Sequence, residues 1–250
     1  MTVVSGRFRS SAELQRVSGG WVFGPAMDAG RGERSVSQGY FLAIAGNIGV
    51  GKTELTNRLS AELGWLAYYE PVIHNPYLDD FYGDMARWSF HLQIYFLSER
   101  FKAQVQIGDS PLPFIQDRTI YEDAEIFART LYEQGSMSEV DYQNYDSLFR
   151  ILVSFLRRPD LVIYLKASPE SLMGRIARRG RPSEAGITLD YITRLNRAYD
   201  DWMRRTRLEG EVLEIDTDRV PLQGDTDAFR GLVDDLKRRY PRQAELRLDE

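Results

Sequence analysis

The residues from Gly46 to Thr53 match the phosphate-binding pattern G-x-x-x-x-G-K-S/T, which restricts the surrounding fold more than any other feature of this chain. Its chemistry requires a strand before the loop and a helix after it, because the helix contributes its positive dipole end to the phosphate. Residues 41–45 form a short apolar run that stops at a glycine, as a buried parallel strand does. Residues 52–63 carry leucines at helical spacing, and Gly64 stands where a helix ends in positive φ. The sequence therefore predicts a strand, a phosphate loop and a helix.

The loop predicts a site for ATP and Mg²⁺. Backbone N–H groups would point at phosphate oxygens, Lys52 would reach the β- and γ-phosphates, and the Thr53 hydroxyl would hold Mg²⁺. The residues that we expect to bind ATP are Gly46, Asn47, Ile48, Gly49, Val50, Gly51, Lys52 and Thr53. A glycine-rich turn with a chance Lys-Thr pair is the alternative, and the flanking patterns argue against it. The loop identifies only the nucleotide, because GTPases, ATPases, motor proteins and kinases share it.

The rest of the chain repeats short apolar runs separated by longer segments of helical pattern. The runs lie at residues 66–69, 114–116, 161–165 and 212–215. Helical patterns cover residues 87–106, 123–133, 138–157, 169–179, 189–207 and 227–240. This alternation predicts an α/β fold with a parallel sheet of about five strands and helices on both faces.

The N-terminal segment differs in composition from the rest of the chain. Residues 1–38 are rich in Ser, Gly and Arg and show no sustained period, which favours a flexible tail. A start codon assigned too early, with Met27 as the internal candidate, would give the same composition. No internal repeat indicates a second domain, so we expect one domain over residues 39–250.

The composition excludes several classes of protein. A net charge of −5 is unlike a surface built for nucleic acid or anionic lipid, so any phosphate site must be local. The chain has no cysteine, which excludes disulfides and thiolate catalysis. No apolar run approaches the ~20 residues of a membrane-spanning helix, and the N-terminus lacks a signal-peptide pattern. We expect a cytoplasmic protein that binds neither nucleic acid nor membrane.

The acceptor of a phosphoryl group must be recognised outside the loop. Glu70 follows the second apolar run, at the edge where open parallel sheets bind ligands. A carboxylate there can take a proton from an attacking hydroxyl, although position alone fits a surface strand end equally well.

Several linked motifs around Glu70 resemble the deoxynucleoside kinase family. They are Glu70-Pro71-Val72, Asn75-Pro76-Tyr77-Leu78, Phe81-Tyr82, the stretch from Arg87 to Gln93 and the stretch from Gln116 to Asp123. The resemblance runs from about Tyr40 to the last strand, and it is greatest with the bacterial deoxyadenosine/deoxycytidine kinases. It implies a P-loop kinase fold and transfer of the γ-phosphate of Mg·ATP to a deoxynucleoside 5′-hydroxyl in deoxynucleotide salvage.

The resemblance also implies catalytic roles. Glu70 would be the general base, and Arg118 would orient Glu70 and the transferring phosphoryl group. Lys52 of the phosphate loop is the third catalytic candidate. Both roles suit phosphoryl transfer, which depends on positioning and charge stabilisation. Asp117 would complete the Mg²⁺ shell, and its alternatives are a helix N-cap or an ion pair with Arg118.

The resemblance implies a deoxynucleoside site as well. Gln93 would read the base edge beside a charged pair of Arg100 and Asp123, a set that favours bases with an exocyclic amino group. Tyr82 would bind the sugar 3′-hydroxyl, a task that Glu184 would share.

Three aromatic residues are further candidates for the walls of that site. Trp88 would form one wall. Phe90 and Phe127 are candidate stacking surfaces, although aromatic residues at helical spacing are more often core.

An arginine-rich segment from Arg175 to Pro182 ends a predicted helix and resembles the lid of this family. The resemblance places Arg175, Arg179 and Arg181 on the ATP phosphates, with glycines that let the loop close. A solvated basic face is the alternative for an arginine run, and the phosphate loop argues against it.

Other functions and properties stay open on the sequence alone. A deoxyguanosine kinase would keep the same loop, lid and base, and a P-loop switch protein would use the loop without a small-molecule acceptor. The resemblance implies a homodimer through helices 87–106 and 138–157, and feedback inhibition by a deoxynucleoside triphosphate.

Overall fold

The computed structural model describes residues 39–69, 75–108, 110–206, 211–224 and 226–241, together with the backbone of 15–17 and 20–22. The two N-terminal pieces are the strands β1 (Gln15–Val17) and β2 (Gly20–Val22), which pair antiparallel and belong to a unit separate from residues 38–250. The expectation of a tail over residues 1–38 did not include this strand pair. The remainder of that segment lies outside the described residues.

The five predicted strands form one parallel sheet. They are β3 (Phe41–Gly46), β4 (Leu66–Tyr68), β5 (Phe114–Asp117), β6 (Leu161–Lys166) and β7 (Val212–Asp216), in the order β4-β5-β3-β6-β7. The central strand β3 is fully buried, as its uninterrupted apolar run predicts. The C-terminal ends of β3 and β5 carry the phosphate loop and Arg118, so parallel pairing brings the two segments to one edge of the sheet.

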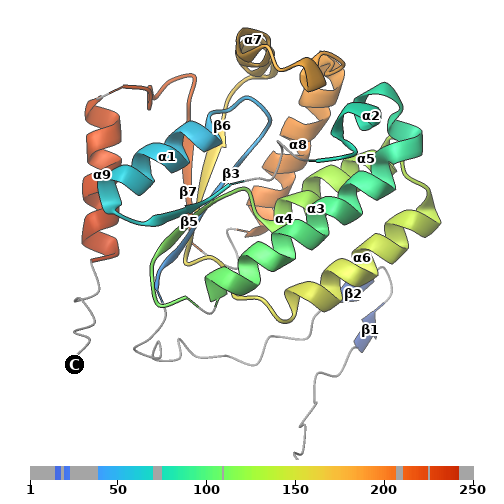
Figure 1. The fold of residues 1–250 in the computed structure, drawn as a ribbon, viewed down its shortest axis with the longest axis horizontal. Coiled ribbons are helices and arrows are strands. Elements are labelled where there is room, and N and C mark those ends of the chain that lie inside the picture. The colour runs from blue at the N-terminus through green and yellow to red at the C-terminus, as the bar shows by residue number, and fades with distance from the viewer. Residues whose placement is uncertain are drawn as a thin grey trace, which may run out of the picture. The chain divides into compact units, whose positions relative to one another are not determined.

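Helices cover both faces of this sheet (Figure 1). The α-helices are α1 (Lys52–Leu63), α2 (Leu78–Gly83), α3 (Met85–Gly108), α4 (Ile120–Glu122), α5 (Arg129–Glu133), α6 (Glu139–Val153), α7 (Pro169–Arg179), α8 (Leu189–Thr206) and α9 (Asp227–Arg239). Helices α1 and α9 pack together on one side, while α3, α6 and α8 lie on the other. The P-loop kinase fold with a five-stranded parallel sheet is confirmed.

Three helical segments differ from the sequence prediction. The segment predicted at residues 123–133 begins with a π-helix, η1 (Asp123–Ala128). Helix α6 ends four residues early, because Ser154, Phe155 and Leu156 donate to carbonyls three residues back, a tighter turn than an α-helix has. Helix α2 was not predicted, since it has only six residues. In the described part of the chain, no helix has the length and apolarity needed to cross a bilayer.

Candidate active site

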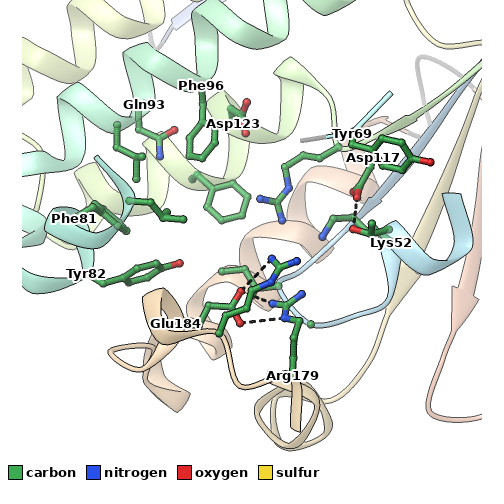
Figure 2. A pocket seen from close by; sticks show the side chains of 18 of the residues that line it. Lys52, Tyr69, Phe81, Tyr82, Gln93, Phe96, Asp117, Asp123, Arg179 and Glu184 are labelled. Carbon is green, nitrogen blue, oxygen red and sulfur yellow. Dashed lines mark hydrogen bonds and ion pairs between the residues drawn. The ribbon is translucent and has the colours of Figure 1, made fainter. Parts of the chain in front are cut away.

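A cavity of about 330 Å³ lies between the phosphate loop, α2, α3, the turn after β5 and the lid (Figure 2). This volume falls in the range of small-molecule sites. Most of the predicted site residues within the described segments line it: Ile48, Gly49, Lys52, Thr53, Tyr82, Gln93, Asp117, Arg118, Asp123, Arg179, Arg181 and Glu184. Residues separated by more than a hundred positions in the chain therefore face one space.

The phosphate loop has the conformation that its glycines permit. Gly46, Gly49 and Gly51 have φ of 144°, 82° and 106°, which residues with a Cβ rarely adopt. A Cβ on Gly46 would lie 2.4 Å from the carbonyl oxygen of Leu165. The Lys52 ammonium lies inside the loop, donating to the carbonyl oxygens of Gly46 and Asn47 at 2.8 and 3.0 Å.

Two groups of the loop are already engaged by other parts of the protein. The Asn47 side chain donates to the Ile192 carbonyl at 3.0 Å and to Asn196 at 2.6 Å, which ties the loop to α8. The Gly46 N–H donates to the Glu122 carboxylate at 3.1 Å. Later in the loop, Gly49, Lys52 and Thr53 line the cavity next to the start of α1, and the N-terminus of a helix attracts phosphate.

Thr53 and Asp117 form an oxygen-rich corner beside the loop. The Thr53 hydroxyl donates to Asp117 Oδ2 at 2.5 Å, while Asp117 Oδ1 is buried with no hydrogen-bond partner among the described residues. A hydroxyl and an incompletely satisfied carboxylate are ligands that suit Mg²⁺. The alternative of Asp117 as a helix cap does not hold, because Thr119 is the N-cap of α4.

Arg118 adopts a backbone conformation that is costly for its residue type. Its φ is 64°, the single positive φ of a non-glycine residue in the described segments. Such strain persists where surrounding contacts impose it, and it concentrates at functional sites. The guanidinium is buried, lies 4.4 Å from the centre of the Phe127 ring and lines the cavity.

Glu70, the predicted general base, lies outside the described residues. Its neighbour Tyr69 follows β4, lines the cavity and donates its hydroxyl to Asn57 at 2.6 Å.

Gln93 is the polar group on the α3 wall of the cavity. It is 2% exposed, and its Oε1 has no hydrogen-bond partner in the described part of the chain. A buried amide acceptor without a partner is costly, so the position is suited to a ligand donor. Figure 2 shows Gln93 near Phe96 and Asp123, on the side of the cavity away from Lys52.

The predicted pair of Arg100 and Asp123 is present beneath Gln93. Arg100 Nε lies 2.9 Å from Asp123 Oδ2, and both side chains are 2% exposed. Arg100 also donates to the carbonyl oxygens of Asp117 and Arg118 at 3.0 and 2.7 Å. Asp123 lines the cavity and Arg100 does not, so Arg100 lies behind the wall and supports the turn that presents Arg118.

The aromatic residues divide differently from the expectation. Trp88 packs against Tyr77 and His91, at 5.8 and 5.4 Å between ring centres, and is not among the described residues that line the cavity. Tyr82 and Phe127 do line it, whereas Phe90 does not. The sequence offers no signal for this division, because all these aromatics sit at helical spacing.

The sequence did not predict several of the residues that line the cavity: Tyr69, Leu78, Phe81, Leu92, Phe96 and Tyr191. It did not predict a role for Glu122 either. Tyr191 of α8 lines the cavity, and burial raises the pKa of its hydroxyl while Arg118 opposes that rise. Glu122 is fully buried and accepts the Gly46 N–H. No local pattern marks Tyr191. Glu122 follows Thr119 at the spacing of a capping box, which the two residues form at the start of α4. That pattern does not reveal the bond from Gly46, because the bond joins distant segments.

The arginines of the lid gather around the phosphate loop. Arg175, Arg178, Arg179 and Arg181 border a hollow that also contains Gly49, Gly51 and Thr53. Arg175 is additionally bonded to Thr217 Oγ1 at 2.8 Å and to Asp218 at 3.1 Å. This convergence on one loop is unlike a solvated basic face, which would spread along a helix.

Glu184 holds two of these arginines at the cavity mouth. It accepts from Arg179 at 2.6 and 3.1 Å, and Arg181 lies 3.6 Å away. Gly186 approaches Tyr82 so closely that a Cβ there would lie 3.2 Å from the Tyr82 carbonyl oxygen. The segment that follows the lid arginines, residues 182–186, therefore touches α2 beside the cavity.

Comparison with known proteins identifies relatives over most of the chain. The model of a family described as deoxynucleoside kinase matches residues 42–239. The chain is 40% identical over 206 residues to a deoxyadenosine/deoxycytidine kinase of Bacillus subtilis, covering 82% of this chain and 94% of that protein. It is 44% identical over 167 residues to a deoxyadenosine kinase of Dictyostelium discoideum, covering 67% and 68%. Deoxyguanosine kinases also match.

Solved structures give the same result. A deoxyadenosine kinase from M. mycoides with bound dATP superposes with a TM-score of 0.70 and 29% sequence identity, covering 79% of this chain and 99% of that one.

Proposed function

This chain belongs to the deoxynucleoside kinase family, and from that premise we propose that it transfers the γ-phosphoryl group of ATP to the 5′-hydroxyl of deoxyadenosine or deoxycytidine. One observation carries the proposal. A single cavity joins the phosphate loop, with Lys52 and Thr53, to the buried amide of Gln93. A nucleotide switch needs the first half of that cavity only, whereas a kinase needs both.

The transfer forms a bond between the 5′-oxygen and the γ-phosphorus and breaks the bond to the oxygen that ADP retains. Negative charge spreads over the equatorial oxygens in the transition state, so fixed cations around them lower the barrier. We assign this role to Lys52 from the loop, Arg118 from the β5 turn and Arg179 from the lid, all of which line the cavity. Arg175 and Arg181 border the adjoining hollow and would neutralise the remaining phosphates.

The proton of the 5′-hydroxyl must pass to a base. We assign this role to Glu70, which directly follows Tyr69 at the cavity wall. The support is the resemblance of the Glu70-Pro71-Val72 motif to the family, combined with the position after β4. A carboxylate beside the attacking oxygen suits a reaction that depends mainly on positioning.

Thr53 and Asp117 would hold Mg²⁺ in this reaction. Their short contact and the unpartnered Asp117 Oδ1 provide oxygen donors next to the loop. No cluster of three or more His, Cys, Asp or Glu that could hold a metal occurs within the described ranges. A Mg²⁺ ion at a kinase site is commonly held by only one or two protein side chains. When bound here, Mg²⁺ would neutralise part of the phosphate charge.

Base preference follows from the chemistry of Gln93. Its buried Oε1 requires a donor, and the exocyclic amino groups of adenine and cytosine supply one. Guanine carries a carbonyl acceptor at the corresponding edge, so it would leave this acceptor unpaired unless the amide turned over. The buried Arg100–Asp123 pair limits space behind Gln93 and keeps that wall rigid. A deoxyguanosine kinase remains the second candidate, because such enzymes also match the chain.

The sugar would be held at the lid. Tyr82 lines the cavity from α2, and Glu184 lines it from the segment after the lid arginines, next to Tyr82 in the close view (Figure 2). We propose that both groups bind the 3′-hydroxyl, which would make lid closure depend on the deoxynucleoside.

Assembly and regulation extend the proposal. Helix α6 and the residues after it expose Val140, Leu148, Ile151 and Phe155 at helical spacing, and Phe155 is 76% exposed. Such an apolar stripe suits a homodimer through α6 and its neighbour α3. We also propose feedback inhibition by a deoxynucleoside triphosphate, supported by the dATP that the M. mycoides enzyme binds. The reaction would take place in the cytoplasm, where its donor ATP is available.

The test is ADP release from Mg·ATP with each of the four natural deoxynucleosides, comparing the wild type with Glu70→Gln. We expect turnover on deoxyadenosine or deoxycytidine that the substitution reduces by about 10²-fold or more. Turnover on deoxyguanosine alone would establish the second candidate. If no deoxynucleoside accelerates ADP release, the acceptor assignment is wrong.

A further inference from the structure

We infer that Glu122 is a positioning residue, whose carboxylate holds the phosphate loop and the Arg118 turn at a fixed separation. The inference rests on the phosphoryl transfer proposed above, because it concerns the relative placement of the ATP and acceptor halves of that site.

The two carboxylate oxygens of Glu122 serve opposite halves of the site. Oε1 accepts the N–H of Gly46 at 3.1 Å and the hydroxyl of Tyr199 at 2.8 Å. Oε2 accepts the N–H of Thr119 at 2.9 Å. The side chain is 0% exposed, so bulk solvent does not reach these bonds. One rigid group therefore connects the end of β3 to the residue after Arg118.

The strand geometry explains why Gly46 needs this acceptor. The Ile44 carbonyl points toward β5, because it accepts the N–H of Arg118 at 3.0 Å. Two residues later in a strand, the N–H of Gly46 points to the same side. Strand β5 has ended there, since the chain turns away at Arg118 with φ of 64°. Glu122 supplies the acceptor that a longer β5 would have supplied.

The surrounding charges suit an ionised carboxylate in this place. The Glu122 carboxylate is the acceptor in all three of these hydrogen bonds, as an ionised carboxylate must be. Arg118 Nε lies 3.9 Å from Oε1. Burial raises the pKa of Glu122, and the cations of Arg118 and Lys52 oppose that rise. In its ionised form the carboxylate would also attract the cations of Lys52 and Arg118, which repel each other.

The substitution Glu122→Gln tests the connection. Glutamine has the same shape but one acceptor oxygen, so either Gly46 or Thr119 would face an NH₂ group and shift away. The phosphate loop and the acceptor side should each keep their own internal structure, and only their separation should change. We expect kcat to fall by about 10²-fold, the scale of a 1 Å misplacement, while KM for ATP and for the deoxynucleoside each stay within about threefold.

Two further variants separate the connection from other roles. Glu122→Asp keeps the charge, but the aspartate side chain is too short to reach the N–H groups of both Gly46 and Thr119. If the connection matters, kcat of this variant should therefore fall as much as that of Glu122→Gln. Tyr199→Phe removes one bond to Oε1 and leaves both backbone bonds, so its kcat should stay within about threefold of the wild type. The concentration of folded enzyme comes from the stoichiometry of Mg·ADP binding by calorimetry, which removes any effect on folding yield.

The wild-type rate reports on the proposed function, and the ratio of variant to wild type reports on Glu122. A wild-type kcat per folded molecule in both Glu122 variants would overturn the inference, as would a raised KM for ATP with unchanged kcat. A wild-type kcat in Glu122→Asp alone would show that the negative charge is sufficient and that the hydrogen-bonded connection is not needed. That result would also overturn the inference. If the wild type lacks kinase activity, the proposed function fails. In that case Mg·ADP affinity still tests the inference about Glu122: a change of more than threefold in Glu122→Gln would mean that the ATP half of the site is itself disturbed, which overturns the inference.

Discussion

The hydroxyl of Thr53 donates a hydrogen bond to Asp117 across 2.5 Å, joining the first turn of α1 to the end of β5. These residues lie 64 positions apart and meet because β3 and β5 are adjacent parallel strands. If this corner holds Mg²⁺, its loss should appear first in the magnesium dependence of the reaction.

Asp117→Asn should therefore raise the Mg²⁺ concentration required for half-maximal activity by about tenfold or more, because an amide oxygen replaces a charged ligand. The measurement is ADP release as a function of MgCl₂ at saturating ATP and deoxynucleoside. Asp234→Asn, at an exposed position of α9, is the matched control and should leave the curve unchanged. Identical magnesium curves for wild type and Asp117→Asn would exclude Asp117 as a ligand.

Gln93→Leu should lower kcat/KM for the preferred deoxynucleoside by about 10- to 100-fold, because the base then buries its amino group without a partner. KM for ATP should not change, since Gln93 lies away from the phosphate loop. The exposed Gln106 on the same helix provides the control, Gln106→Leu. An equal loss on all four deoxynucleosides would indicate a general packing defect in place of base recognition.

Tyr82→Phe should lower kcat/KM for the deoxynucleoside by about three- to tenfold, the effect of one lost hydrogen bond. With a 2′,3′-dideoxynucleoside, which lacks the 3′-hydroxyl, the variant and the wild type should react equally. Glu184→Gln should behave in the same way, although it also weakens the lid contact with Arg179. A loss of the same size on both substrates would contradict binding of the 3′-hydroxyl by Tyr82.

The stability of the protein should depend on pH through Glu122. Burial raises its folded-state pKa above the ordinary value of 4.5, against the opposing charges of Arg118 and Lys52. Between the two pKa values the folded chain binds more protons than the unfolded chain, so the free energy of unfolding falls as pH rises.

The Glu122→Gln variant lacks this titration. The free energy of unfolding of the wild type minus that of the variant should therefore decrease as pH rises above 4.5. Urea titrations of both proteins at a series of pH values measure this difference. An increase with pH would mean that the folded-state pKa is lowered.

Ile151→Arg should dissociate a homodimer formed through α6. Ile151 is 56% exposed within the apolar stripe, and a buried unpaired guanidinium at an interface is strongly unfavourable. Sedimentation velocity measures the change, with the exposed polar position Gln143→Arg on the same helix as control. A wild-type protein that sediments as a monomer would remove the homodimer proposal.

Much of the fold could be read from local patterns. The apolar runs predicted all five strands within two residues at each end. The reason is clearest for β3, because a fully buried parallel strand needs an uninterrupted apolar segment. Helices α1 and α7 were predicted with their observed bounds, since Gly64 and Gly180 mark their ends in positive φ. The early end of α6 was not predicted, because the tighter turn there has no residue signature.

The sequence by itself determined the strand, phosphate loop and helix around Lys52, because glycine, lysine and threonine act there through their own backbone and neighbours. Only the tertiary structure decided that the Asn47 side chain binds α8 and that Trp88 packs away from the cavity. It also decided that Glu122 accepts the N–H of Gly46, a bond that spans 76 positions. The physical reason is the same in each case: a side chain's partners depend on which segments the sheet brings together, and neither composition nor spacing specifies that.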